Sequence, residues 1–263
     1  MLIYGILINN KFKNKIIYID KVEMFLSLVT ALLSLNILPS NKISIIKPNL
    51  VFFTGGNSLM PSFIYSNFIE KLEEYYSVNV INNLQNKDNN VLEKLLNIYK
   101  DDNDFIAIGH SSGATSLLNY CNKFDINKYI LLDPVDNNKL INNNELEFKD
   151  NKVLIINAAK SYKWKSNFPL PQIPFVPIGK LENKFQKYNE ITIKEAGHCD
   201  ILDDPYNSFM NNNFAEGLED RKQVKNYKNC LINLINLYTM NNLNNKTVEI
   251  IDNYNLEYEY DEK

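Results

Sequence analysis

Histidine and cysteine are scarce in this chain, which has two histidines and three cysteines in 263 residues. Cys121, Cys199 and Cys230 lie far apart in the sequence, without the close pairs that zinc sites use. We therefore expect no metal and no other cofactor. Three separate thiols are also typical of a reducing intracellular compartment. Any chemistry that needs an imidazole must use His110 or His198, because the chain has no other.

Excess positive charge is also missing. The chain has 28 Lys and Arg against 31 Asp and Glu, a net charge of −3 and a pI of about 5.6, and no long basic run. Domains that bind nucleic acid carry basic patches or stripes, so we expect no nucleic-acid partner. The length suits one domain with a sizeable core.

Glycine is rare as well, and five of the eight glycines fall in three short segments around Gly55, Gly109 and Gly197. One segment is the pattern G-x-S-x-G, centred on Ser111. It follows an apolar run rich in β-forming residues, 105–108, and precedes a helix-compatible run, 114–123. A nucleophilic serine on a sharp strand-to-helix turn has this pattern and this context, which are those of the α/β-hydrolase nucleophile elbow.

Apolar strand-like segments alternate with helix-like segments from residue 47 onward. This alternation is typical of a mainly parallel sheet that is covered by helices on both faces. We therefore predict an α/β protein with the α/β-hydrolase fold, as a single domain over residues 1–263. The expected strands are 50–53, 78–81, 104–108, 129–132, 153–156 and 190–193, and the expected helices are 62–76, 91–99 and 114–123.

Residues 1–46 form an extension before this pattern begins. Residues 2–8 and 15–19 alternate apolar and polar side chains and predict a β-hairpin. Residues 21–36 predict an apolar helix, and no charge occurs from Met24 to Asn41. We interpret this helix as packed on the domain or lying in a membrane interface, which makes peripheral membrane contact one expected partnership. A targeting segment or anchor is the alternative.

Two further segments interrupt the alternation. Residues 158–188 contain four prolines, which exclude a regular helix or a central strand over that part. The segment also contains four aromatic residues, Tyr162, Trp164, Phe168 and Phe175. These residues predict a lid or substrate-pocket wall, and the alternative is a surface loop that its aromatic side chains dock onto the domain. Residues 241–263 are polar and acidic, and predict an exposed tail with a possible strand at 247–251.

A serine hydroxyl becomes a good nucleophile only when a base takes its proton. His198 follows the last predicted core strand and Gly197, whereas His110 lies inside the elbow, with its side chain expected to point away from the Ser111 hydroxyl. We therefore predict His198 as the base. Asp133 ends the strand after the elbow helix and is the predicted acid that orients it, with Asp136 as the reserve.

The negative charge that develops on the substrate oxygen needs two backbone N–H donors. One is predicted at Ser112, the residue after the nucleophile. The other is predicted in the glycine loop after the first core strand, at Gly56, with Asn57 as the alternative.

Two segments resemble those of chlorophyllases and their α/β-hydrolase relatives. They are Leu132-Asp133-Pro134-Val135 and Gly197-His198-Cys199-Asp200-Ile201-Leu202-Asp203-Asp204. The resemblance extends over roughly residues 50–205 and maps Ser111, Asp133 and His198 onto the catalytic triad of that family. It implies hydrolysis of carboxylic esters with long hydrophobic alcohol or acyl parts, so the expected partner is a small hydrophobic ester substrate. It departs at Ser112, where chlorophyllases usually have Arg, and at Thr54-Gly55-Gly56, where they have His-Gly-Phe. These departures concern the substrate more than the triad.

The sequence therefore predicts a serine esterase or lipase that acts through an acyl-enzyme. An acyltransferase or thioesterase would use the same three residues, so the sequence leaves these alternatives open. A non-catalytic binding protein on the same fold is a further alternative, and it would be expected to lack part of the triad.

Overall fold

The computed structural model describes residues 47–55, 60–81, 105–118, 126–135, 153–161, 188–213, 215–243 and 245–262, together with residue 93 and two short strands near the N-terminus. The chain divides into two units, Met1–Ile46 and Lys47–Lys263. In the first unit β1 (Gly5–Ile6) pairs antiparallel with β2 (Ile17–Tyr18), which is consistent with the predicted hairpin. The predicted helix over 21–36 lies outside the described residues.

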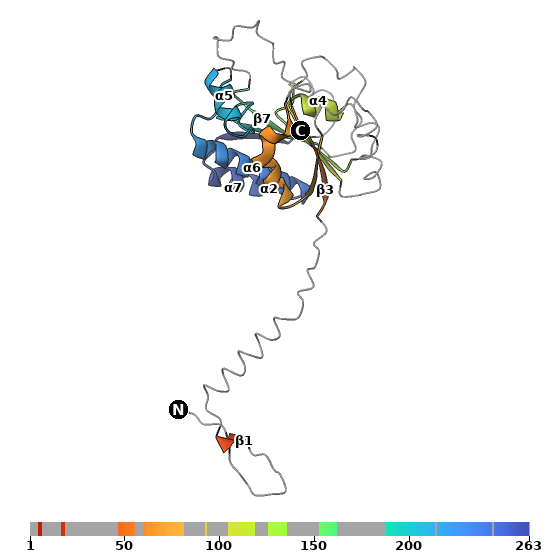
Figure 1. Ribbon diagram of the computed structural model, residues 1–263, viewed down its shortest axis with the longest axis vertical. Coiled ribbons are helices and arrows are strands. Elements are labelled where there is room, and N and C mark those ends of the chain that lie inside the picture. The colour runs from red at the N-terminus through yellow and green to blue at the C-terminus, as the bar shows by residue number, and fades with distance from the viewer. Residues whose placement is uncertain are drawn as a thin grey trace. The chain divides into compact units, whose positions relative to one another are not determined.

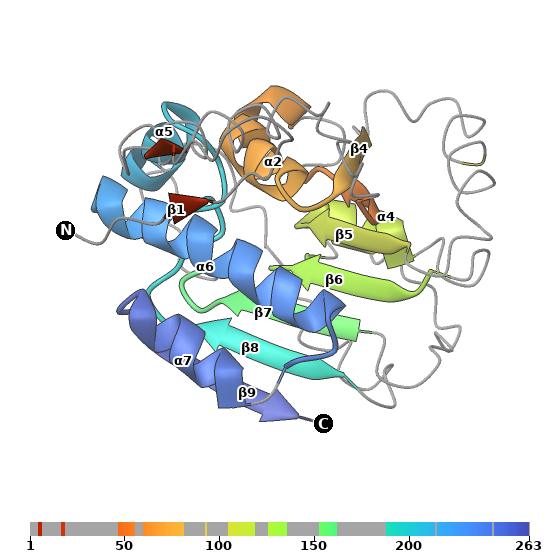
Figure 2. The same ribbon diagram turned by 90° about the horizontal axis from the view of Figure 1, so that it is seen from below.

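The second unit is built on a seven-stranded sheet of order β4-β3-β5-β6-β7-β8-β9 (Figures 1 and 2). All neighbouring strands are parallel except the pair β8 and β9 at one edge. The strands are β3 (Asn49–Phe53), β4 (Ser77–Ile81), β5 (Ile106–His110), β6 (Lys128–Leu132), β7 (Val153–Ala158), β8 (Asn189–Ile193) and β9 (Tyr258–Glu262).

Nearly every residue of the central strands is buried, because helices cover both faces of the sheet. Alternate strand residues therefore belong to two separate cores. Leu50 and Phe52 face the core shared with η1 (Ser62–Tyr65), α2 (Ser66–Glu73), α6 (Arg221–Thr239) and α7 (Asn245–Asn253). Val51 and Phe53 face the core shared with α4 (Ser112–Leu118). Figure 2 shows α2, α6 and α7 together on one side of the sheet.

This architecture confirms the predicted α/β-hydrolase fold, and each of the six predicted core strands is present within one or two residues. The predicted helix 62–76 is a 3₁₀ turn continued by α2. The predicted helix 91–99 lies outside the described residues except for residue 93. Within the part of the chain that the structure describes, no helix combines the length and the apolar character needed to cross a membrane.

The C-terminal segment differs from its prediction. Residues 247–251 belong to α7 and not to a strand, and the following residues form β9 on the edge of the sheet. Thr247 and Ile251, four residues apart, are both fully buried on the inner face of the helix, and Leu256 is 6 % exposed. Tertiary packing of this helical face outweighs the β-propensity of the local sequence, so the prediction of an exposed tail is wrong.

Candidate active site

The three predicted triad residues follow three different strands of the sheet. Ser111 directly follows β5, Asp133 directly follows β6, and His198 follows β8 after a short loop. Since parallel strands end at the same edge of a sheet, segments that follow them can converge there. The side chains of the three residues are indeed in hydrogen-bond contact, although up to 87 positions separate them in the sequence.

Ser111 occupies a strained turn between β5 and α4. Its φ of 56° lies in the left-handed region, which non-glycine residues rarely adopt. The flanking glycines are needed because the turn is tight: a Cβ at Gly109 would lie 2.5 Å from the Cα of Ala114, and a Cβ at Gly113 would lie 2.5 Å from the carbonyl oxygen of Phe53. The turn is thus the sharp elbow that the sequence predicts.

His198 lies between the serine and the aspartate. Its Nε2 is 2.9 Å from Ser111 Oγ, and its Nδ1 contacts Asp133 Oδ2. Because a carboxylate only accepts, Nδ1 carries a hydrogen and donates it to Asp133, which leaves Nε2 of the neutral ring to accept from the Ser111 hydroxyl. All three residues are at most 7 % exposed. The imidazole is therefore arranged to remove a proton from Ser111.

Asp133 is held by three donors. Besides His198, the backbone N–H of Ala158 donates to Oδ1 at 3.0 Å and the hydroxyl of Ser161 donates to Oδ2. Burial by itself would raise the pKa of Asp133, but these hydrogen bonds and the neighbouring imidazole outweigh it and hold the pKa below its usual value. The acid is therefore ionised and fixed. No pattern in the sequence indicates the contact with Ser161, which lies 28 positions from Asp133.

His110 belongs to a second hydrogen-bonded chain, which confirms that it does not face the Ser111 hydroxyl. Its Nε2 is 3.2 Å from the carbonyl oxygen of His198, which can only accept, so Nε2 carries the hydrogen. Nδ1 then accepts from the hydroxyl of Tyr65 at 2.8 Å, and Tyr65 in turn accepts from the N–H of Gly55 at 3.1 Å. This chain links the glycine loop, the elbow and the loop of His198.

The buried position of His110 predicts acid-sensitive stability. Burial, reinforced by the neighbouring His198, lowers the pKa of His110 from 6.5 to about 3. Between pH 6.5 and pH 3 the unfolded state binds a proton at His110 and the folded state does not. The free energy of unfolding is therefore highest above pH 6.5 and falls as the pH drops below that value. At about 1.4 kcal/mol per pH unit, one such group costs roughly 2 kcal/mol between pH 7 and pH 5.

Urea unfolding at the two pH values measures this loss. His110→Gln, which does not titrate in this range, should be less stable than the wild type at pH 7 but should lose about 2 kcal/mol less on acidification. Equal losses in the two proteins would mean that His110 is not the group responsible.

Asp200 fixes the loop that carries His198. It is fully buried and accepts four hydrogen bonds. Its donors are the backbone N–H groups of Gly197 at 2.7 Å and Leu218 at 2.9 Å, and the side-chain amides of Asn207 at 3.1 Å and Asn211 at 2.6 Å. Burial raises the pKa of Asp200, and these donors oppose that shift. The contacts join the loop to α5 (Tyr206–Asn213) and to the segment before α6.

The glycine loop approaches the elbow closely. A Cβ at Gly55 would lie only 2.9 Å from the Cβ of Ser111, so the loop after β3 passes beside the nucleophile. Ser112 opens α4 directly after Ser111. Several predicted residues lie outside the described residues, namely Gly56, Asn57, Asp136, Tyr162, Trp164, Phe168 and Phe175.

Metal-binding side chains do not gather in the described part of the chain, where no three His, Cys, Asp or Glu residues form a group that could hold an ion. Cys199 and Cys230 are buried free thiols, and burial raises the pKa of Cys230 to about 12. Neither thiol is therefore prepared to act as a nucleophile.

Comparison with known proteins shows similarity only to solved structures, since the chain matches no family model and no curated protein. One is a hydrolase of the α/β superfamily from Xanthomonas campestris pv. campestris, with 12% identity and a TM-score of 0.37 over 58% of this chain and 88% of that one. YahD, solved with malic acid, is 14% identical and gives a TM-score of 0.40 over 71% of this chain and 93% of that one. A YdeN-like hydrolase from Pectobacterium atrosepticum is 13% identical and gives a TM-score of 0.38 over 70% of this chain and 87% of that one. The strand order and strand directions of the sheet establish the fold independently of these similarities.

Proposed function

We propose that this protein is a serine hydrolase that cleaves carboxylic esters with a hydrophobic part. The observation that carries the proposal is the position of the His198 imidazole, with Nε2 at 2.9 Å from Ser111 Oγ and Nδ1 bonded to Asp133. A structural histidine would need neither a strained serine on one side nor a buried, ionised carboxylate on the other.

The reaction begins when Ser111 Oγ attacks the ester carbonyl carbon and its proton passes to His198 Nε2. Asp133 stabilises the imidazolium that results. The N–H groups of Ser112 and Gly56 donate hydrogen bonds to the carbonyl oxygen and stabilise the negative charge that develops on it. The tetrahedral intermediate then collapses, and the alcohol leaves with the proton from Nε2.

The acyl group is now attached to Ser111. A water molecule gives a proton to His198 Nε2 and attacks the acyl carbonyl, and the second tetrahedral intermediate releases the carboxylic acid as Ser111 regains its proton. An alcohol in place of water would give acyl transfer with the same residues, and product analysis with an added alcohol separates the two outcomes.

The aromatic residues of 158–188 predict the substrate class. If Tyr162, Trp164, Phe168 and Phe175 line the pocket, longer acyl chains bury more apolar surface in the transition state. Each buried methylene gains about 0.8 kcal/mol, so four more methylenes should raise kcat/KM by roughly 10²-fold. A p-nitrophenyl ester series from acetate to decanoate measures this. A maximum at acetate would contradict the pocket wall and, with it, the hydrophobic substrate implied by the chlorophyllase resemblance.

A fluorophosphonate probe tests the hydrolase proposal itself. The probe phosphonylates an activated serine, and peptide mapping should place the label on Ser111. Labelling at another serine, or no labelling of the folded protein, would overturn the proposal even if the ester series were uninformative.

A further inference from the structure

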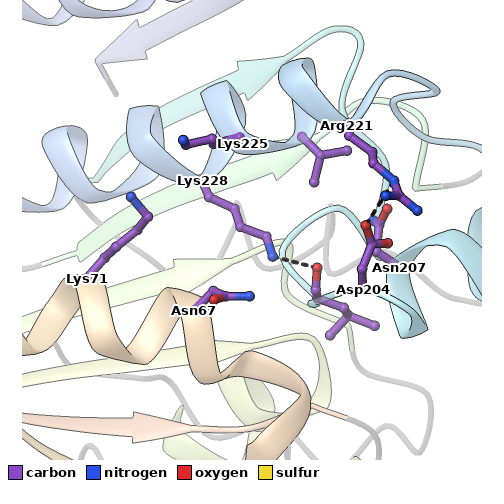
Figure 3. Close-up of a pocket in the computed structure, with 9 residues that line it drawn as sticks. Asn67, Lys71, Asp204, Asn207, Arg221, Lys225 and Lys228 are labelled. Atoms are coloured by element: carbon purple, nitrogen blue, oxygen red, sulfur yellow. Dashed lines mark hydrogen bonds and ion pairs between the residues drawn. The ribbon is translucent and has the colours of Figure 1, made fainter.

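A cavity of about 280 Å³ lies between α2 and α6, apart from the triad. It is lined by Leu202 and Val224 and by seven polar or charged residues that Figure 3 labels: Asn67, Lys71, Asp204, Asn207, Arg221, Lys225 and Lys228. Lys71 projects from α2 toward α6, which carries Arg221, Lys225 and Lys228 (Figure 3). Four cationic side chains thus surround one small cavity in a protein whose net charge is −3.

Two of the four cations are compensated by carboxylates. Lys228 is buried and its Nζ is 2.7 Å from Asp203 Oδ1, while Arg221 Nε is 3.3 Å from Asp204 Oδ2. Lys71 donates to the neutral amide oxygen of Asn229 at 2.5 Å and has no carboxylate partner among the residues that the structure describes. Lys225 is exposed and has no carboxylate partner within the described residues. Two positive charges from different helices therefore remain beside the cavity.

Three exposed aromatic side chains lie on η1 and α5, within a few residues of positions that line the cavity. Phe63 is 58 % exposed and stands one helical turn before Asn67, which lines the cavity. Its ring is 5.6 Å from that of Tyr206, which precedes the lining residue Asn207 and lies two positions after the lining residue Asp204. Phe209, one turn further along α5, is 57 % exposed. We call Phe63, Tyr206 and Phe209 the aromatic rim.

We propose that the cavity and the aromatic rim together form a docking surface for an anionic membrane, in which the cavity receives a lipid phosphate group and the rim enters the headgroup region. Charge complementarity favours an anionic ligand, because in the described part of the chain neither Lys71 nor Lys225 pairs with a carboxylate. The rim favours a membrane over a soluble anion, because aromatic rings gain free energy at the membrane–water interface and would otherwise stay in water. The proposal does not depend on the hydrolase function.

Vesicle sedimentation of the full chain tests the docking surface. The wild type should bind phosphatidylcholine vesicles that contain phosphatidylserine more tightly than vesicles of phosphatidylcholine alone. A lysine near an anionic membrane contributes about 1 kcal/mol, so Lys71→Gln with Lys225→Gln should lower the partition coefficient roughly 20- to 30-fold. Phe63→Ser with Phe209→Ser should lower it by about tenfold or more on both kinds of vesicle.

Matched controls separate this surface from general charge and hydrophobicity. Lys194→Gln with Lys222→Gln removes the same formal charge from exposed positions that do not line the cavity, with Lys194 paired to Glu259 at 3.4 Å. Met240→Ser removes an exposed apolar side chain beyond the far end of α6. Both variants should bind like the wild type.

Three results would overturn the proposal. The first is equal loss in the cavity and control variants, and the second is wild-type binding that ignores phosphatidylserine. The third is binding of glycerol 3-phosphate in solution that needs Lys71 and Lys225 while the vesicle binding does not, which would make the cavity a site for a soluble phosphate.

Discussion

Ser111→Ala should reduce ester hydrolysis by roughly 10⁴- to 10⁶-fold, because the variant has no oxygen to form the acyl-enzyme. Removal of the nucleophile alone abolishes nearly all the benefit of the triad, since the base and the acid act only through it. Hydrolysis of p-nitrophenyl butyrate measures the rate, and the fluorophosphonate label should disappear in parallel.

The neighbouring serine provides the control. In the proposed mechanism Ser112 contributes only its backbone N–H, so Ser112→Ala should keep much of the activity. Both variants should remain folded, because alanine fits the space of serine and the strained φ of 56° at position 111 is imposed on either side chain. Activity retained by Ser111→Ala and lost by Ser112→Ala would reject Ser111 as the nucleophile.

Asp133→Asn should lower kcat by about 10³- to 10⁴-fold, with a much smaller effect on KM. The carboxylate accepts from His198, Ser161 and Ala158 at the same time. An amide has a single acceptor oxygen, so its NH₂ group must face at least one of these donors. It can then hold the imidazole in the wrong tautomer, with Nε2 protonated and unable to accept from Ser111. The imidazolium also loses its counter-charge.

Asp136, the reserve candidate, is the matched comparison. Asp136→Asn should change kcat far less than Asp133→Asn, and thermal unfolding of both variants shows whether a loss of activity is only a loss of structure. The opposite ranking of the two variants would move the acid to Asp136.

Most of the sheet could be predicted from the sequence, because its central strands are buried on both faces and must be apolar throughout. Segments 50–53, 129–132 and 153–156 meet this requirement, and their residues are buried in the two cores of the sheet. The same local logic failed at residues 247–251. There the β-branched run suggested a strand, but Thr247 and Ile251 are one helical turn apart and pack on the core.

The candidate site divides in the same way. Ser111 has a sequence pattern that only a sharp turn needs, the chain has only two histidines from which to choose a base, and Asp133 ends a recognisable strand. The sequence by itself therefore determined which three residues to propose, with Asp136 left as the reserve acid. Only the tertiary structure decided what holds them. Ser161 reaches Asp133 across 28 positions, and Tyr65 reaches His110 across 45. Asp200 accepts a hydrogen bond from the backbone N–H of Leu218, which lies 18 positions away. These partners are ordinary residues in ordinary sequence, because a hydrogen bond between distant segments depends on where the chain brings two atoms and leaves no pattern in either segment.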